Sequence, residues 1–536
     1  MKTKVITKFI RDIYDTDKVI PLHAPSFYGR EDELVAETLE STFVSSVGKY
    51  VEEFESKFEE YTGASKAVAT VNGTSALQVS LELAGVSNND LVLTQSLTFI
   101  ATCNAISQAG ASPIFIDVNL NSLGMCPYSL EEFIHDKAYL DDKGILRLQE
   151  TDQAIKAVLP MHTFGHPIQL DEIAKICKCN NLELIEDAAE GVGSFYKGRH
   201  LGTNGRFSAL SFNGNKIITT GGGGMILCKY KEDGNLAKHI TTTAKLNHKY
   251  EFFHDQNAYN YRMPNLNAAL GCAQFENLDQ MLKNKRVLAQ SYKNFFESTE
   301  VKFFSEPDYA SSNYWLNAVF FNDRDSKIKF LEESNDSGIG TRPIWTLMTE
   351  LPMYKDAFQS DLSNSLWIEE RLVCLPSSYC PNLRDWMYIL VIGASGFVGN
   401  SLLRRLNGFE NIEVKAVSRD IKKVSGDFKD SKNISFQKFD LCNDNFSKLD
   451  FSPNIIINLS STQPSSDNLA WGDFLEGNVS SVSSLVDYAR SKKIEKIIHL
   501  STSSVFSPSQ SPINKDTLPS PDNYYGLSKL LGENLL

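Results

Sequence analysis

The stretch LSFNGNKIITTGGGGMIL, residues 210–227, brings a single lysine, Lys216, next to a run of four glycines. An apolar segment precedes the lysine, and glycine allows neighbouring backbones to pack closely around it. An amine that acts as a nucleophile at neutral pH needs a rigid setting and a lowered pKa. We therefore interpret Lys216 as a reactive lysine that follows a buried strand. A solvated loop lysine is the alternative reading of the same residues.

Apolar, β-branched runs alternate with helix-like segments on both sides of this stretch. The runs are KAVATV (66–71), DLVLTQ (90–95), SPIFIDV (112–118), IKAVLPM (155–161), LELIEDA (182–188) and FSALSF (207–212). Strands that are apolar throughout and separated by helices are typical of a mostly parallel sheet with both faces covered. The first part of the chain is therefore expected to have an α/β fold.

Two upstream motifs supply partners for the lysine. LIEDAAEGVGS (184–194) ends a predicted buried strand with a carboxylate, Asp187, which is costly to bury without a cation such as a protonated pyridine nitrogen. VNGTSALQVSLELAG (71–85) opens a helix with Gly-Thr-Ser, whose amides and hydroxyls suit a phosphate. Each motif alone also fits an ordinary strand end or helix cap. Together with Lys216 they are the parts that pyridoxal 5′-phosphate requires.

Residues 20–383 resemble the DegT/DnrJ/EryC1/StrS family of sugar aminotransferases. The matching segments are NGTSAL, SLTFIATCNAISQAGASPIFIDV, EDAAEGVGS, SFNGNK with its glycines, and NYRMPNLNAALGCAQ (260–274). The resemblance implies the aspartate-aminotransferase type of pyridoxal-phosphate fold (fold type I) over residues 1–385, working as a homodimer. A large cofactor domain would cover about 20–250 and a small C-terminal subdomain about 251–385.

The resemblance also implies a role for each matching side chain. Lys216 would bind the cofactor covalently, and Asp187 would pair with its pyridine nitrogen. The other implied contacts are Phe99 over one ring face, Thr74, Ser75 and Ser211 at the phosphate, and Asn260 at the phosphate of the partner subunit. Glu190 stands where many members have glutamine, so the contact to the phenolic oxygen would differ. Members that dehydrate carry histidine in place of this lysine, so lysine here favours transamination.

Two further segments narrow the expected substrate. TFVSSVGKYVEEFE (42–55) and GIGTRPIWTLMTELPMY (338–354) resemble the branch that aminates UDP-linked 4-keto-6-deoxy-N-acetylhexosamines on routes to legionaminic-type sugars. L-Glutamate would be the amino donor. Candidate substrate contacts are His162, Arg262 and Arg342, although the two arginines also fit surface salt bridges. HTFGH (162–166) has a spacing that binds metal on a helix, but its glycine and the following proline predict a loop, so no metal is expected.

A second α/β domain is expected from Met387 onward, with the boundary near 383–387. LVIGASGFVG (390–399) places Gly393, Gly396 and Gly399 between a strand and a helix, the pattern of a dinucleotide-binding turn in a Rossmann doubly wound sheet. The next strand, EVKAVSRD (413–420), ends with Arg419, which suits a 2′-phosphate and favours NADP. The adjacent Asp420 keeps NAD open. Asp440, in FDLCN (439–443), is a further candidate cofactor contact.

YYGLSK (524–529) contains Tyr525 and Lys529 one helical turn apart, where the cation lowers the pKa of the tyrosine. Residues 387–536 resemble the extended short-chain dehydrogenase/reductase family (NAD-dependent epimerase/dehydratase), which implies Thr502 as the catalytic hydroxyl. Two serines follow it where dehydratases carry Asp-Glu, so epimerisation or ketone reduction stays open. The chain ends seven residues after Lys529. We therefore expect a truncated Rossmann domain that binds NADP weakly and has no activity by itself.

The whole chain of 536 residues carries a net charge of −13 and a pI of about 5.3. This charge disfavours nucleic-acid binding, which needs a basic face. The sequence has neither a long apolar stretch nor a signal-peptide pattern, and its nine cysteines are scattered, so no membrane partner and a cytoplasmic location are expected. Two alternatives remain: a non-catalytic protein that keeps the pyridoxal-phosphate fold, and an epimerase or reductase whose active half is the C-terminal domain.

Overall fold

The computed structural model describes residues 3–297, 299–381, 383, 387–409, 412–449, 451–464, 470–492, 494, 496–507, 513–514 and 517–536. The chain forms two compact units that divide between residues 383 and 384. This division lies just before the expected end of the first domain at 385, and residues 384–386 themselves lie outside the described part.

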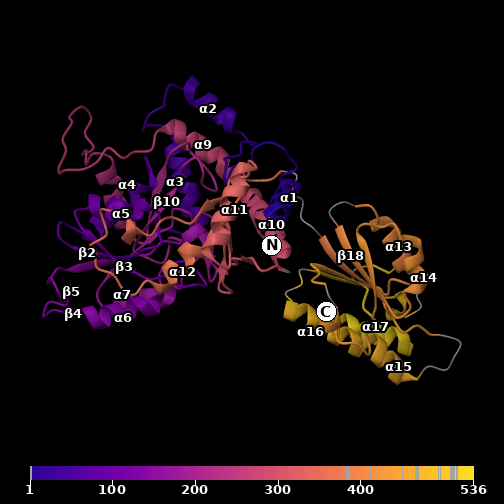
Figure 1. Cartoon of the computed structure of the whole chain (residues 1–536). Helices are drawn as coiled ribbons and strands as arrows, with labels where there is room; N and C mark the ends of the chain where they lie inside the picture. Colours follow the sequence, from indigo (N-terminus) through magenta and orange to yellow (C-terminus); the bar gives the residue numbers. More distant parts are fainter. Residues whose placement is uncertain are drawn as a thin grey trace. The chain divides into compact units, whose positions relative to one another are not determined.

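A seven-stranded sheet forms the centre of the first unit (Figure 1). Its strand order is β1 (Lys66–Thr70), β11 (Gly224–Cys228), β10 (Phe207–Ser211), β7 (Glu183–Asp187), β6 (Ile155–Leu159), β2 (Leu91–Gln95) and β3 (Ser112–Ile116). Only β11 runs antiparallel to its neighbours, because the segment that contains Lys216 and the glycines turns the chain back from β10. The expected mostly parallel α/β fold is confirmed.

Helices cover both faces of this sheet. One apolar cluster joins it to α4 (Gly73–Leu83), α5 (Ile100–Gln108) and α8 (Lys231–Thr241). The other joins it to α3 (Lys49–Thr62), α6 (Pro127–Lys137), α7 (Leu170–Cys179) and α9 (Asn265–Glu276). Since the strands are buried on both faces, their sequences are apolar throughout rather than alternating.

A smaller sheet has the order β12 (Lys302–Phe303), β14 (Asn317–Phe320), β16 (Leu372–Leu375) and β15 (Arg342–Pro343). It shares an apolar cluster with α1 (Thr3–Tyr14), α10 (Leu278–Phe296) and α11 (Arg324–Asp336). The expected division near residue 250 stays a prediction, because one apolar cluster joins α3 and α9 of the large sheet with Ala318 on β14 and Cys374 on β16 of the smaller sheet.

The second unit is a five-stranded parallel sheet covered on both faces. Its strand order is β19 (Ile434–Lys438), β18 (Ile412–Ser418), β17 (Met387–Ile392), β20 (Ile455–Asn458) and β21 (Lys496–His499). Figure 1 shows α13 (Phe397–Leu406) and α14 (Lys422–Ser425) on one face, and α15 (Trp471–Leu475), α16 (Ser481–Lys492) and α17 (Tyr524–Glu533) on the other. This is the expected Rossmann arrangement, whose chain order reverses between β17 and β20, where such sheets bind ligands.

No helix in the described part of the chain is long and apolar enough to cross a membrane.

Candidate active site

Lys216 lies on a short turn directly after β10, and the exposed fraction of its side chain is 13%. Its backbone N–H donates to the carbonyl oxygen of Asn213 at 3.0 Å, which closes the turn. Its ammonium donates to Glu190 Oε1 at 3.2 Å and lies 4.0 Å from the centre of the Trp315 ring. The lysine is therefore held between a carboxylate and an aromatic face, and the solvated-loop alternative does not fit.

Glu190 is buried, and its second oxygen accepts the backbone N–H of Phe164 at 2.8 Å. Burial raises the pKa of Glu190 to about 7, against the lowering effect of the Lys216 charge. Phe164 has a left-handed backbone with φ of 57°, a strained conformation for a non-glycine residue. This local strain directs its N–H toward the carboxylate.

Asp187 ends β7 and is also buried. It accepts a hydrogen bond from the hydroxyl of Thr102 at 2.6 Å and from the backbone N–H of Ala189 at 3.1 Å. Burial raises its pKa above the usual range for aspartate. In the described residues no side chain forms an ion pair with it. A buried carboxylate without a cation fits the protonated pyridine nitrogen that the sequence predicts.

The first turn of α4 lies against the end of β10. A Cβ atom at Gly73 would be 3.1 Å from the Cβ of Ser211, and one at Gly224 would be 2.4 Å from the backbone just before α4. Glycines are thus required where the helix N-terminus meets the β10–β11 connection. Thr74 and Ser75 belong to this first turn, where the positive end of the helix dipole and the two hydroxyls favour an anion, while the backbone N–H of Ser75 already donates to Asn72 Oδ1 at 2.7 Å. The cradle fits a phosphate, and with Lys216 and Asp187 it fits pyridoxal phosphate.

Phe99 lies immediately before α5 with 47% of its surface exposed. Its ring centre is 6.1 Å from that of Trp345, and the ring of Phe164 is 5.4 Å from Trp345 and 6.3 Å from Trp315. The four rings form a chain that reaches the lysine through Trp315. Phe164, Trp345 and Thr102 were missed as site residues in the sequence, although all three lie inside the quoted segments.

His162 is fully buried and faces a different carboxylate, Glu186. Its Nε2 lies 3.0 Å from Glu186 Oε2, and its Nδ1 accepts the backbone N–H of Ile168 at 3.4 Å. Successive residues of a strand point to opposite faces, so Glu186 and Asp187 serve different surroundings. The position of His162 does not fit the expected substrate contact, because both ring nitrogens are occupied and none of the ring is exposed.

The remaining predicted substrate contacts lie nearer the surface. Arg262 is half-buried, pairs with the last residue of β1 in an isolated bridge and donates through Nε to Asn260 Oδ1 at 3.1 Å. Asn260 itself is exposed. Arg342 is exposed on β15 and donates to Asn335 Oδ1 and to the carbonyl of Thr341, both at 2.7 Å.

Two basic residues lie near Lys216 that no sequence motif predicts as part of the site. Lys285, on α10, is buried and donates to the carbonyls of Trp315, at 2.7 Å, and Ser377. Burial lowers its pKa well below the usual range. His23, near the N-terminus, has its ring centre 6.4 Å from that of Trp315. Burial, followed by the charges of Lys285 and Lys216, lowers the pKa of His23 well below its usual value, so it is neutral.

The second unit has a site of its own at the end of β17. Gly393 has a φ of 83°, and a Cβ at Gly399 would lie 2.5 Å from the Gly393 carbonyl oxygen. Gly396 caps the start of α13. Arg419 follows β18 and is exposed, and Asp440 follows the neighbouring β19, where its carboxylate accepts from the side-chain amide of Asn443 at 3.0 Å. The glycine turn and these two charged residues thus follow three adjacent strands.

The three predicted catalytic residues of this unit belong to α17 and the turn against which it packs. Lys529 is buried, and its Nζ lies 3.1 Å from His499 Nε2 and donates to the carbonyl of Leu500 at 2.7 Å. Burial lowers the pKa of Lys529 to about 8 and that of His499 to about 4. Thr502 accepts the backbone N–H two residues later at 3.2 Å, and Tyr525 is half-buried.

The chain matches two families. Residues 26–387 match the DegT/DnrJ/EryC1/StrS aminotransferase family, and residues 389–536 match the NAD dependent epimerase/dehydratase family. GDP-perosamine synthase of Escherichia coli O157:H7 is 36% identical over 64% of this chain and 89% of its own length. The putative pyridoxal phosphate-dependent aminotransferase EpsN of Bacillus subtilis (strain 168) is 33% identical over 67% and 91%.

Solved structures agree with the first assignment. The aminotransferase TlmJ from Streptoalloteichus hindustanus superposes with a TM-score of 0.61 at 25% identity, over 67% of this chain and 93% of its own. Helicobacter pylori PseC, an aminotransferase involved in the biosynthesis of pseudoaminic acid, shares the fold with a TM-score of 0.61 at 20% identity, over 67% and 94%. The chain belongs to the DegT/DnrJ/EryC1/StrS family of pyridoxal-phosphate-dependent sugar aminotransferases and carries an NAD-dependent epimerase/dehydratase domain at its C-terminal end.

Proposed function

We propose that this nucleotide-sugar aminotransferase converts a UDP-linked 4-keto-6-deoxy-N-acetylhexosamine to the 4-amino sugar, with L-glutamate as the donor. The product would serve surface-polysaccharide or nonulosonic-acid biosynthesis. The observation that carries the catalytic part is the placing of Lys216, Glu190 and Asp187 beside the phosphate cradle of α4. The substrate rests on the resemblance of residues 42–55 and 338–354 to one branch of the family.

Each residue of the site then has a chemical task. Bound pyridoxal phosphate supplies a ring that accepts electrons from the donor's Cα. Asp187 would keep a proton on the ring nitrogen, since a buried carboxylate favours a cationic neighbour. Thr74, Ser75 and Ser211 would hold the phosphate, and Phe99 would lie against the ring. Lys216 Nζ, once free, carries the proton taken from the donor's Cα.

Arg262 and Arg342 are the proposed anion contacts, for the nucleotide diphosphate or the carboxylate of glutamate. Arg262 is the better placed of the two, because its bridge to the end of β1 brings it close to the start of α4. Arg342 is exposed, and its guanidinium already donates hydrogen bonds to two acceptors. Separate alanine variants should raise the KM of different substrates if the two arginines bind different anions.

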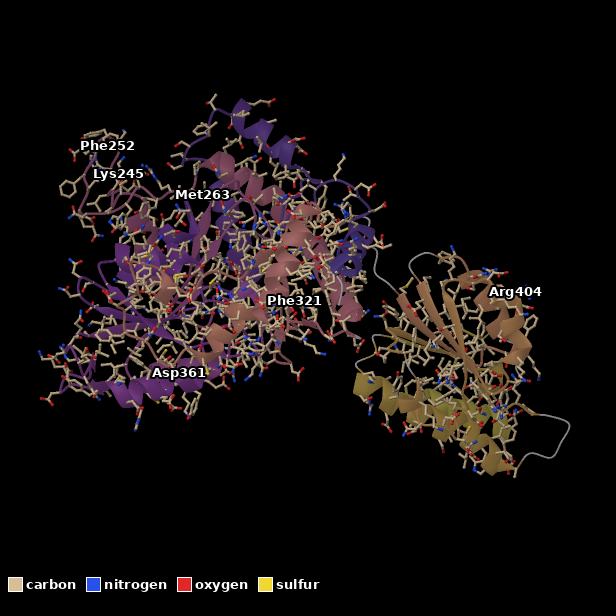
Figure 2. All side chains as sticks on the ribbon, viewed as in Figure 1. Lys245, Phe252, Met263, Phe321, Asp361 and Arg404 are labelled. Atoms are coloured by element: carbon tan, nitrogen blue, oxygen red, sulfur yellow. The ribbon has the colours of Figure 1, made fainter. Side chains whose placement is uncertain are left out.

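A second copy of the chain is the proposed partner. The segment between α8 and α9 carries strongly exposed aromatic side chains, among them Tyr250 at 75% and Phe252 at 79%. Lys245 lies 3.8 Å from the Phe252 ring, and Figure 2 shows both on a loop that extends away from the body of the first unit. Asn260 follows this loop directly, which supports a homodimer in which it reaches the partner's phosphate site. Light scattering after size-exclusion chromatography tests this.

A GDP-linked 4-keto sugar is the second candidate substrate. Relatives named GDP-perosamine synthase occur in E. coli, Vibrio cholerae and Caulobacter vibrioides at 36%, 33% and 32% identity. The deciding experiment incubates the purified chain with glutamate and either the UDP-linked or the GDP-linked 4-keto sugar, followed by mass analysis. Amination of the UDP-linked substrate alone supports the proposal. Amination of the GDP-linked substrate alone replaces it with the second candidate.

The second unit is proposed to bind NADP through its glycine turn and Arg419, with Thr502, Tyr525 and Lys529 as its catalytic set. Calorimetry with NADP and NAD tests the binding, and a reductase assay on the keto sugar tests whether this unit is an active half. A cytoplasmic location is part of the proposal, since the nine cysteines are scattered along the sequence rather than arranged as a disulfide framework.

A further inference from the structure

Trp315 meets the turn that carries Lys216 at two points. Its indole Nε1–H donates to the carbonyl of Asn215 at 2.6 Å, and the face of its ring lies 4.0 Å from Lys216 Nζ. A cation over a tryptophan face is attracted by the ring quadrupole, more strongly when partly shielded from water. One side chain thus fixes both the backbone before the lysine and the position of its ammonium.

The backbone of Trp315 is itself fixed by two hydrogen bonds. Its carbonyl accepts from the buried Lys285 at 2.7 Å, and its backbone N–H donates to Asn313 Oδ1 at 2.8 Å. The preceding Tyr314 has a left-handed φ of 47°. The left-handed backbone of Tyr314 costs folding free energy. So does the buried Lys285, which has no ion pair in the described residues. Both features fix the position of Trp315.

We propose that Trp315 is a positioning residue for Lys216: its N–H fixes the turn, and its ring face holds the ammonium against Glu190. This assignment rests on the proposed function only in treating Lys216 as the reactive amine. Core packing alone does not require the indole N–H of Trp315 to reach the lysine turn or its ring to face the ammonium.

The groups around Lys216 decide how the contact is measured. Glu190 Oε1 lies 3.2 Å from the ammonium, Asp187 acts on it from the end of β7, and the ring centre of neutral His23 lies 6.4 Å from that of Trp315. The face of the Trp315 ring covers the ammonium at 4.0 Å. Removing the ring should therefore make the amine more accessible to a reagent, in a protein that holds neither cofactor nor substrate.

The test is reductive methylation of the cofactor-free full chain with formaldehyde and cyanoborohydride at one pH, with the rate at Lys216 measured by peptide mass spectrometry. Trp315→Leu should raise this rate about threefold or more, because the ring no longer covers the ammonium. Trp315→Phe keeps a ring but loses the N–H. Its methylation rate should stay near that of the wild type, while kcat falls about tenfold and KM stays within about threefold, because the turn loosens.

Trp367→Leu is the matched control, because Trp367 also lies under a cation, 5.0 Å from Arg371, on α12 (Ser363–Arg371). It should leave the methylation rate of Lys216 and kcat unchanged. An unchanged methylation rate in Trp315→Leu, with a normal circular dichroism spectrum, would overturn the ring contact. Normal kcat in Trp315→Phe would overturn the role of the N–H. Since the methylation rate needs no turnover, it stays informative if the proposed substrate is wrong.

Discussion

Lys216 and Lys529 occupy the predicted catalytic positions of the two units. The groups that contact the two ammonium ions differ in charge. Lys216 faces a carboxylate and an indole ring. Lys529 faces the imidazole of His499 and a backbone carbonyl, and burial lowers its pKa to about 8. The comparison shows that a sequence motif around a lysine does not determine which groups its ammonium contacts. Those groups are brought in by segments that are distant in the sequence.

The largest expected effect on activity comes from removing Lys216. Lys216→Ala should lower transamination by a factor on the order of 10⁴, because the proton carrier at Cα is lost. Lys238→Ala is the control, since Lys238 also pairs with a mostly buried glutamate, Glu55, at 2.5 Å. It should keep near-normal activity. Multiple turnovers at the wild-type rate by the Lys216 variant would remove this residue from the mechanism.

The next largest effect is also expected in the first unit, at the carboxylate of Asp187. Asp187→Asn should lower kcat by about 10²–10³, because an amide does not hold a proton on the ring nitrogen. The fold should survive, since asparagine can still accept from Thr102. Steady-state kinetics and circular dichroism measure the two effects. A kcat within a few-fold of the wild type would contradict the proposed role.

Much of this site can be predicted from local sequence, because local patterns determine where strands end and helices begin. Asp187 ends a buried strand, Lys216 lies on the turn that follows another, and the phosphate cradle opens a helix, so strand pattern and capping chemistry locate them. Trp315 lies far along the chain from Lys216, and its contact depends on the left-handed Tyr314 and buried Lys285, which no periodicity reveals.

One expectation differs from the structure for an identifiable reason. A substrate contact is expected at His162, but the ring faces Glu186, which alternates with Asp187 on β7. The extent of the small subdomain stays a prediction, because one apolar cluster joins residues of both sheets and periodicity along α9 does not show which subdomain it belongs to.

A change in the second unit tests its nucleotide preference. Arg419→Ser should weaken NADP binding about tenfold and leave NAD affinity nearly unchanged, because only NADP carries the 2′-phosphate. Calorimetry with both nucleotides measures the difference. Equal losses for the two nucleotides would place Arg419 elsewhere than at the 2′ position.

The last prediction concerns stability rather than activity or binding. Folding raises the pKa of Glu190 from about 4.5 to about 7, so the folded state binds the extra proton and its stability falls as pH rises through this window. Glu190→Gln should therefore raise the free energy of unfolding at pH 8 by on the order of 2 kcal/mol relative to wild type, with less gain at pH 5. Denaturant titrations at the two pH values measure this. An equal gain at both would show that Glu190 does not titrate there.

The site at which pyridoxal phosphate is attached tests the central claim most directly. The purified chain would be loaded with the cofactor, reduced with borohydride, digested and mapped by peptide mass spectrometry. We expect the pyridoxyl group on Lys216 and on no other lysine, Lys285 and Lys529 included. Attachment at a different lysine, or full aminotransferase activity in protein that carries no pyridoxyl group on Lys216, would contradict the account.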